Sequence, residues 1–152
     1  MIIQIDSREQ APLEFKIVGN VSKVETMGLL FGDYQAMLED GTPIPIAWER
    51  KSIPDLYSTL THGHDRFRRE LERARQHAFQ MYLIIEGSLS DVLEGVGHSK
   101  VEPDTLVKSI FTFKVRYGLE PVFCKDRSEM VRYILETFEA FGRSWKKVKK
   151  GA

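Results

Sequence analysis

Two short apolar runs, residues 34–38 and 44–48, constrain the fold of this chain more than any other feature. They flank a polar turn that contains Asp40-Gly41, and an Asp-Gly pair between apolar runs is the strongest short-range signal for a β-hairpin. The second run continues directly into Glu49-Arg50-Lys51. The sequence therefore predicts two antiparallel strands, of which the second ends in charged side chains.

Two hairpin registers fit this segment, and they place the neighbouring acidic residues differently. A tight two-residue turn would pair Asp33 with Trp48 and put Asp33 and Glu49 on opposite faces of the sheet. A five-residue loop would pair Leu38 with Ile44 and set Asp33 directly across from Glu49. We favour the five-residue loop, because only this register places the large apolar side chains of both strands on one face.

In the favoured register the Cβ atoms of Asp33 and Glu49 would lie about 5 Å apart. Like charges directly opposite each other destabilise a sheet unless a positive charge lies between them. Mg²⁺ prefers oxygen ligands and is often held by one or two carboxylates, so this pair indicates a divalent-metal site. Lys51 shares the face of Glu49, since residues two apart on a strand point the same way. The alternative is an ordinary solvated strand end, because Glu and Lys are mostly surface residues.

The remaining chain predicts one domain of the α/β class, a mixed sheet flanked by helices. Further strands are expected at 2–5, 21–27, 81–85 and 120–124. Helices are expected at 55–60, 66–78 (capped by Asp65), 90–93, 103–117 and 127–141. The domain would span residues 1–142, and 143–152 would form a frayed tail with five basic residues.

Composition excludes several classes of protein. The chain has 152 residues and no net charge, so attraction to nucleic acid would have to come from local clusters of cations. Cys124 is the only cysteine, which excludes an intramolecular disulfide and a thiolate zinc site. No apolar run approaches the roughly 20 residues of a membrane span, and the N-terminus does not resemble a signal peptide. We therefore expect an intracellular protein without a membrane partner.

Three ordered motifs resemble the nuclease domain of the XPF/Mus-type structure-specific endonucleases. The motifs are Asp6-Ser7-Arg8-Glu9, Gly32-Asp33-Tyr34 and Glu49-Arg50-Lys51-Ser52-Ile53-Pro54-Asp55-Leu56. The hallmark of that family is a GD, then an ERK, then an aspartate after three intervening residues, where this chain has Asp55. Arg66-Phe67 and the strand that ends at Glu86 also fall where the family has its next helix and strand. The match is dense over residues 2–87 and looser to about 142.

The resemblance implies a restriction-endonuclease-like fold and a Mg²⁺- or Mn²⁺-dependent endonuclease. Such an enzyme would cut branched or flapped DNA near a single-strand junction, in DNA repair or recombination. Asp33 and Glu49 would be metal ligands together with the backbone carbonyl of Arg50, and Lys51 would be the catalytic lysine. Asp6 and Glu9 would lie beside the metal.

The resemblance also implies roles for residues around this centre. Arg8 and Arg66 would contact the DNA backbone, and Arg69 and Arg73 would extend that surface. Alternating arginine and glutamate on 66–78 is equally typical of an ordinary solvated helix. The side chain of Arg50 would brace the site from the opposite face of the strand, and Asp55 would hold Arg50 or Lys51 in place.

Partners and alternatives follow from the same family. Its members pair through the C-terminal part of this domain, so a homodimer through the helices in 104–141 is expected. Many also carry a helix-hairpin-helix DNA-binding domain, which the roughly ten residues after the last predicted helix do not provide. The compartment would be the cytoplasm or nucleoid of a prokaryote or virus-infected cell, otherwise the nucleus. Two other functions remain: a catalytically silent DNA-binding or scaffolding subunit, and a sequence-specific restriction nuclease, for which no base-reading element is found.

Overall fold

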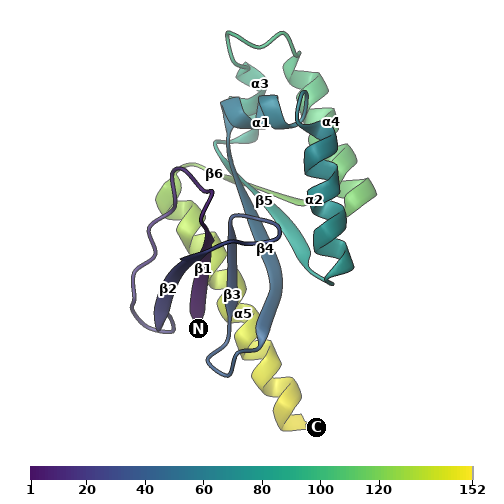
Figure 1. Cartoon of the computed structure of the whole chain (residues 1–152). Coiled ribbons are helices and arrows are strands. Elements are labelled where there is room, and N and C mark those ends of the chain that lie inside the picture. Colours follow the sequence, from purple (N-terminus) through teal and green to yellow (C-terminus); the bar gives the residue numbers. More distant parts are fainter. Residues whose placement is uncertain (152) are drawn as a thin grey trace.

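The computed structural model describes residues 1–151 and contains a six-stranded mixed sheet (Figure 1). The strands are β1 (Ile2–Asp6), β2 (Lys23–Met27), β3 (Tyr34–Met37), β4 (Pro43–Ser52), β5 (Gln80–Glu86) and β6 (Glu120–Cys124). Their order is β2-β1-β3-β4-β5-β6. β3 is antiparallel to both of its neighbours, whereas β1 pairs with β2, and β4 with β5 and β6, in parallel. The predicted mixed α/β sheet is confirmed.

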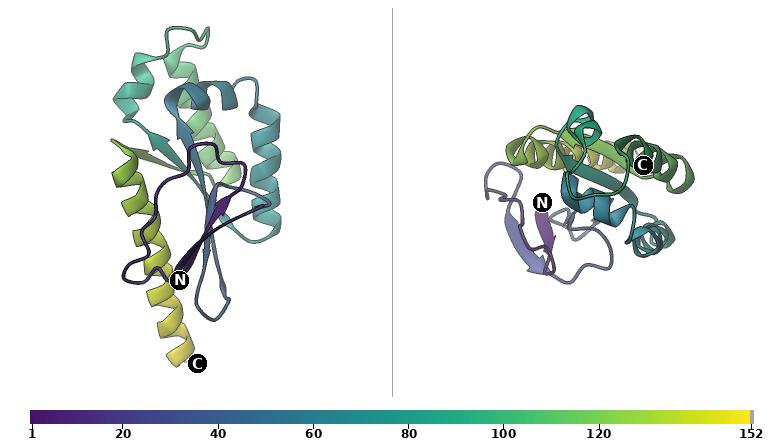
Figure 2. Two further views of the ribbon diagram at one scale, coloured as in Figure 1. Left: turned by 60° about the vertical axis from the view of Figure 1, so that its left-hand side comes forward. Right: turned by 90° about the horizontal axis from the view of Figure 1, so that it is seen from above.

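Helices cover both faces of this sheet (Figure 2). They are α1 (Ile53–Thr59), α2 (His64–Gln76), α3 (Leu89–Glu94), α4 (Pro103–Tyr117) and α5 (Arg127–Gly151). Side chains from α1 to α4 pack on the face that carries Ala47 and Leu83, and α5 packs on the face that carries Trp48 and Ile84. Alternation along β4 and β5 thus gives each face its own core. Among residues 1–151, none of the helices has the length and apolar character needed to cross a bilayer.

The β3–β4 hairpin has a five-residue loop, but it begins one residue earlier than expected. Met37 pairs with Pro43, so the loop is 38–42 and the expected pairing of Leu38 with Ile44 is wrong. The reason is local: both backbone groups of Leu38 form hydrogen bonds within the loop. Leu38 is therefore not available for the sheet.

A β-bulge in β4 restores the expected register nearer the end of the strand. Tyr34 pairs with Trp48, which is the pairing that sets Asp33 beside Glu49. The register shifts in the stretch before Trp48, where β4 has the extra residues and contains Pro45. Proline has no N–H to donate to a sheet and is tolerated at bulges, so this position suits it.

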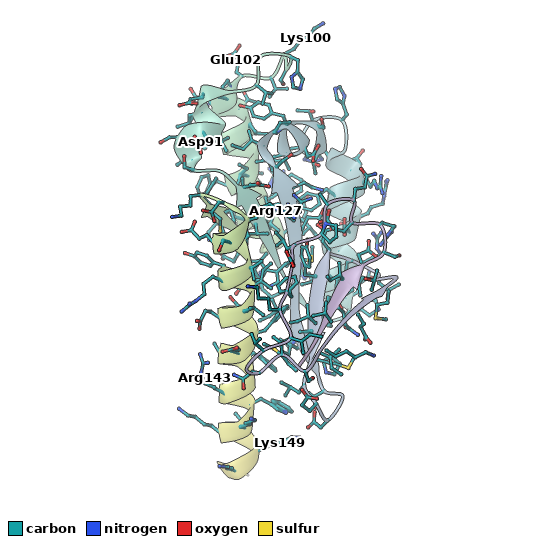
Figure 3. All side chains as sticks on the ribbon, turned by 90° about the vertical axis from the view of Figure 1, so that its left-hand side faces the viewer. Asp91, Lys100, Glu102, Arg127, Arg143 and Lys149 are labelled. Carbon is teal, nitrogen blue, oxygen red and sulfur yellow. The ribbon has the colours of Figure 1, made fainter. Side chains whose placement is uncertain are left out.

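Two expectations about the helices are wrong. α2 begins at His64 with Gly63 as its N-cap, so Asp65 lies inside the first turn and does not cap the helix. The expected frayed tail is instead the continuous end of α5, which runs past Arg143 and Lys149 and extends beyond the sheet (Figure 3). The last residue of the chain lies outside the described residues.

Side-chain contacts accompany the continuation of α5, one within the helix and one to the hairpin loop. The ring of Trp145 stacks on Phe141 with 6.1 Å between centroids, and Lys149 Nζ donates to Asp40 Oδ2 at 2.9 Å. These contacts join the last turns of the helix to its own core side and to the hairpin loop. The lysine-rich sequence at the end of the chain shows the charges, but it does not show the residues that these side chains contact.

Candidate active site

Two carboxylates are brought together where β3 meets β4. The N–H of Asp33 donates to the carbonyl of Trp48 at 2.7 Å, and the N–H of Arg50 donates to Asp33 Oδ2 at 2.7 Å. Glu49 lies between these two β4 residues and is only 6% exposed. The structure thus unites Asp33 and Glu49, as the favoured register requires.

The environment of this pair disfavours two negative charges. Burial raises the pKa of Glu49 to about 8, and the nearby charge of Asp33 acts in the same direction. Burial also raises the pKa of Asp33 to about 6, although the N–H of Arg50 stabilises its ionised form. Two buried carboxylates with raised pKa values will attract a proton or a cation.

Lys51 supplies the positive charge that lies next to this pair. Its Nζ donates to Glu49 Oε1 at 2.6 Å, and its side chain is 20% exposed. Burial alone would lower the pKa of Lys51, but the charges of Glu49, Asp33 and Glu70 raise it above the ordinary value. Lys51 is therefore a charged ammonium and a hydrogen-bond donor at neutral pH.

Glu70 on α2 is a member of the site that sequence reasoning missed. Its Oε1 accepts a hydrogen bond from the N–H of Gly32 at 2.8 Å, and its charge raises the pKa of both Asp33 and Glu49. The available signal was its place directly before Leu71, at the border of the buried stripe of α2. A glutamate at that border can reach over the sheet instead of into solvent.

Gly32 occupies a position where a side chain would approach β4 too closely. Its φ is +72°, and a Cβ would lie 3.1 Å from the Cβ of Ala47 and 3.2 Å from the carbonyl oxygen of Trp48. The turn before Asp33 therefore approaches β4 closely. Glu70 then holds this turn from the α2 side.

A cleft of about 540 Å³ opens beside the carboxylates. Its lining includes Glu49, Lys51 and Glu70, the α1–α2 turn with His62, and Arg66, which was predicted to contact DNA. The cleft is thus lined by side chains of both signs, with Glu49 and Glu70 opposed by Lys51 and Arg66.

The other predicted basic residues lie outside this lining. Arg69 and Arg73 are exposed on α2, and Arg73 Nε donates to the carbonyl of Leu30 at 3.4 Å. The ring of His64 packs edge-on against Phe113 at 4.8 Å between centroids.

The opposite face of β4 holds Arg50 in an ion-pair cluster. Arg50 donates to both oxygens of Glu9, at 2.8 and 3.1 Å, and lies 3.7 Å from Glu86. Burial opposes ionisation of Glu9, but the hydrogen bonds from Arg50 and from the N–H of Ala11 lower its pKa overall. Tyr34 also donates to Glu9. Glu9, expected beside the metal, is thus engaged by Arg50 on the face of β4 opposite to Glu49.

Asp6 and Arg8 hold the loop at Leu29, and the pKa of Arg8 is raised by its hydrogen bond to Asp6 and also by the nearby charges of Glu70 and Asp33. Asp6 Oδ2 accepts from Arg8 Nε at 2.8 Å, and its Oδ1 accepts from the N–H of Leu29 at 2.9 Å. Arg8 Nη2 in turn donates to the carbonyl of Leu29 at 2.7 Å, while its side chain stays 65% exposed. Asp6 therefore positions the segment before Asp33, and Arg8 stays accessible at its edge.

Asp55 does not hold the residues assigned to it. Its N–H donates to the N-cap Ser52 Oγ at 3.3 Å at the start of α1, and the residue is exposed. The partners of Arg50 are Glu9 and Glu86, and the partner of Lys51 is Glu49. The expected supporting role of Asp55 is wrong, because α1 turns it toward solvent.

The donor set fits a hard divalent cation in an open site. Within residues 1–151, no three acidic, histidine or cysteine side chains converge closely enough to form a closed metal centre. Asp33 and Glu49 form a two-carboxylate site, which is the arrangement Mg²⁺ accepts while keeping several waters. The burial of both groups beside one ammonium leaves negative charge that such an ion would neutralise.

Comparisons with known proteins agree with this fold. A family model described as the ERCC4 domain matches residues 5–137. A structure of XPF from Aeropyrum pernix aligns with a TM-score of 0.67 and 20% identity, covering 99% of this chain and 69% of that one. A second, XPF from Aeropyrum pernix in complex with DNA, aligns with a TM-score of 0.63 and 21% identity, covering 96% and 65%. No curated protein matches the sequence. The family model spans most of the chain, so the chain belongs to the ERCC4 domain family.

Proposed function

We propose that this protein is a divalent-metal-dependent endonuclease that hydrolyses phosphodiester bonds in branched or flapped DNA. The observation that carries the proposal is the pair of half-buried Asp33 and buried Glu49 beside Lys51, next to a cleft that Glu49, Lys51 and Arg66 line. Membership of the ERCC4 domain family supports it, as does the fold shared with XPF from Aeropyrum pernix, one structure of which is a complex with DNA.

Asp33 and Glu49 are the residues that would hold Mg²⁺ or Mn²⁺, with the backbone carbonyl of Arg50 as a further expected ligand. Such an ion, when bound, polarises a phosphoryl oxygen and makes water a better nucleophile at neutral pH. The two carboxylates are held at adjacent positions by β4 and by the turn before β3, which orients them before an ion binds.

Lys51 would act as a donor to the phosphate. Its ammonium is already oriented by Glu49 Oε1, and its raised pKa keeps the proton in place. A fixed positive charge at the floor of a cleft stabilises the negative charge that develops on a phosphate during attack. The same property makes Lys51 unsuited to be a general base at neutral pH.

DNA would lie across the cleft, next to exposed polar and basic side chains. Arg66 and His62 line one side, and Arg8 is exposed beside the loop that leads to Asp33. Contacts of this kind to phosphates position the substrate without reading its sequence.

We also propose a homodimer through the C-terminal helices and a role in DNA repair or recombination. Phe111 and Val115 on α4 are 43% and 84% exposed, and Tyr133 on α5 is 47% exposed. These apolar side chains offer surface that a second copy could bury.

The decisive experiment is cleavage of labelled flap, fork, bubble and plain duplex DNA in the presence of Mg²⁺, Mn²⁺ or EDTA. We expect metal-dependent cutting near junctions that Asp33→Asn and Glu49→Gln each abolish while the protein stays folded. Glu72→Gln is the control, since Glu72 pairs with Arg68 on the outer side of α2. Cutting that persists in EDTA, or binding of branched DNA with no cutting under any condition, would reject the proposal, and the second result would identify a silent DNA-binding subunit.

A further inference from the structure

The segment Gly28–Gly32 between β2 and β3 presents a leucine to solvent. This segment extends toward α2 (Figure 1). Leu29 and Phe31 are only 8% and 3% exposed, whereas Leu30 between them is 64% exposed. Full burial of a leucine side chain is worth about 1.5–3 kcal/mol, so this position leaves apolar surface without that stabilisation.

The backbone on both sides of Leu30 is held in place. Asp6 and Arg8 bond the N–H and the carbonyl of Leu29, at 2.9 and 2.7 Å. Arg73 donates to the carbonyl of Leu30 itself, and Glu70 accepts from Gly32.

The ring of Phe31 adds a further anchor, because it packs 5.5 Å from His77 and 5.1 Å from Phe79 between centroids. Leu30 is thus an exposed apolar side chain on a rigid support.

The surroundings of Leu30 identify the chemistry of a partner. Arg8 and Arg73, the two residues that bond the carbonyls of Leu29 and Leu30, are both exposed cations. Three residues further along the chain is Asp33, a member of the carboxylate pair. An apolar surface flanked by negative charges matches this arrangement, and a nucleic-acid strand offers one: a base face between two phosphates.

We propose that Leu30 is an apolar wedge that packs against an unstacked base at the boundary between single-stranded and duplex DNA. The inference rests on the proposed nuclease function and deepens it, because it assigns the recognition of junctions to one side chain. Apolar side chains that insert beside base steps are a known means of binding distorted DNA. The cost of insertion is least where a base already lacks a stacking partner, so the wedge favours a junction over a continuous duplex.

The test uses the full chain in EDTA, so that no DNA is cut. A fork carries 2-aminopurine as its first unpaired base, and fluorescence and affinity are measured beside a plain duplex of equal length. We expect wild-type binding to change the fluorescence of the fork. Leu30→Ala should lose most of this change and bind the fork roughly tenfold more weakly, with unchanged affinity for the duplex. Leu30→Phe should retain the signal.

The control is Ile17→Ala, which removes an equally exposed aliphatic side chain, 63% exposed, from the segment between β1 and β2. This variant should behave as wild type. Wild-type fluorescence and fork affinity in Leu30→Ala would overturn the wedge, and so would an equal loss on fork and duplex. Because this assay needs no metal and no cleavage, a protein that never cuts DNA can still support the wedge. Conversely, if the protein cuts DNA but Leu30→Ala changes neither the fluorescence nor the fork affinity, only the wedge proposal is rejected.

Discussion

At the scale of single residues, Glu49 is a buried acidic group whose environment opposes its ionisation. It is buried on a central strand, faces Asp33 and has one ammonium as its direct partner. Ionising a carboxylate with these neighbours costs free energy. A bound cation would offset this cost. The free energy of folding should therefore report on Glu49 directly.

The stability of the metal-free protein should depend on the protonation of Glu49. Its pKa is raised from 4.5 to about 8 on folding, so its favourable contribution is complete below pH 4.5 and disappears as the pH rises through about 8. In EDTA, Glu49→Gln should melt at a higher temperature than wild type at pH 8.5, by about 3 °C or more, and the gap should close toward pH 5. Melting curves across this range test the sign, and a variant that is less stable at pH 8.5 would contradict it.

Glu70 can be tested by separating its hydrogen bond from its charge. Glu70→Gln keeps an oxygen acceptor for Gly32 N–H, whereas Glu70→Ala leaves that buried donor without its partner. We expect Glu70→Ala to lose about 1–3 kcal/mol of stability and most of its nuclease activity. Glu70→Gln should stay close to wild type in stability but require several-fold more Mg²⁺ in titrations of melting temperature. Equal behaviour of the two variants would show that the hydrogen bond does not position the site.

At the scale of elements, the two faces of β4 carry separate functions. One face holds the carboxylate pair, and the other holds Arg50 against Glu9, with side chains 10% and 6% exposed. Glu86 on β5 and Arg127 on α5 extend this cluster, at 3.7 and 4.0 Å. The cluster joins the segment after β1 to the sheet and α5, and it stabilises the frame of the site without entering it.

Glu9→Gln distinguishes this structural role from the metal-binding role expected of Glu9. Arg50 would lose a charged partner while largely buried, so stability should fall by about 1–3 kcal/mol. The rise in melting temperature on adding Mn²⁺ should be unchanged, because the carboxylate pair is intact. Glu49→Gln should show the reverse: little loss of stability and no response to Mn²⁺. Loss of the Mn²⁺ response in Glu9→Gln would instead indicate that Glu9 is a metal ligand.

Alanine substitutions at two glycines are expected to change the stability of the protein in opposite directions. Gly142 lies within α5, and a Cβ there would make an ordinary 3.4 Å contact with Leu38 Cδ2. Gly142→Ala should therefore stabilise the helix by about 0.5–1 kcal/mol. Gly32→Ala should destabilise the protein, because φ is +72° and its Cβ would meet backbone and side-chain atoms of β4. Denaturant unfolding measures both, and destabilisation by Gly142→Ala would argue against a continuous α5.

At the scale of the whole molecule, periodicity predicted most of the architecture and missed what depends on tertiary contacts. Alternating apolar residues were sufficient for the strands, and burial was sufficient for the pairing near Asp33. The bulge at Pro45 and the reach of Glu70 depend on how β4 and α2 meet, which no local window contains. The helical end of α5 contacts Asp40, a residue distant in sequence. The resemblance to a known family identified the candidate site residues. Only the structure shows that Glu9 pairs with Arg50 on the face of β4 opposite to Glu49.

The charge of the whole chain makes a last prediction about DNA binding. Since the net charge is zero, no overall field attracts DNA, and the salt dependence of affinity must come from a few local cations. Each phosphate contact contributes about 0.9 to the slope of log K against log [salt]. Arg66→Ala, at the rim of the cleft, should therefore lower the slope for fork DNA by about one. Arg132→Ala, on α5 with a side chain that is 78% exposed, should leave it unchanged. An unchanged slope in Arg66→Ala would place the DNA elsewhere, and a loss in Arg132→Ala would place it across α5.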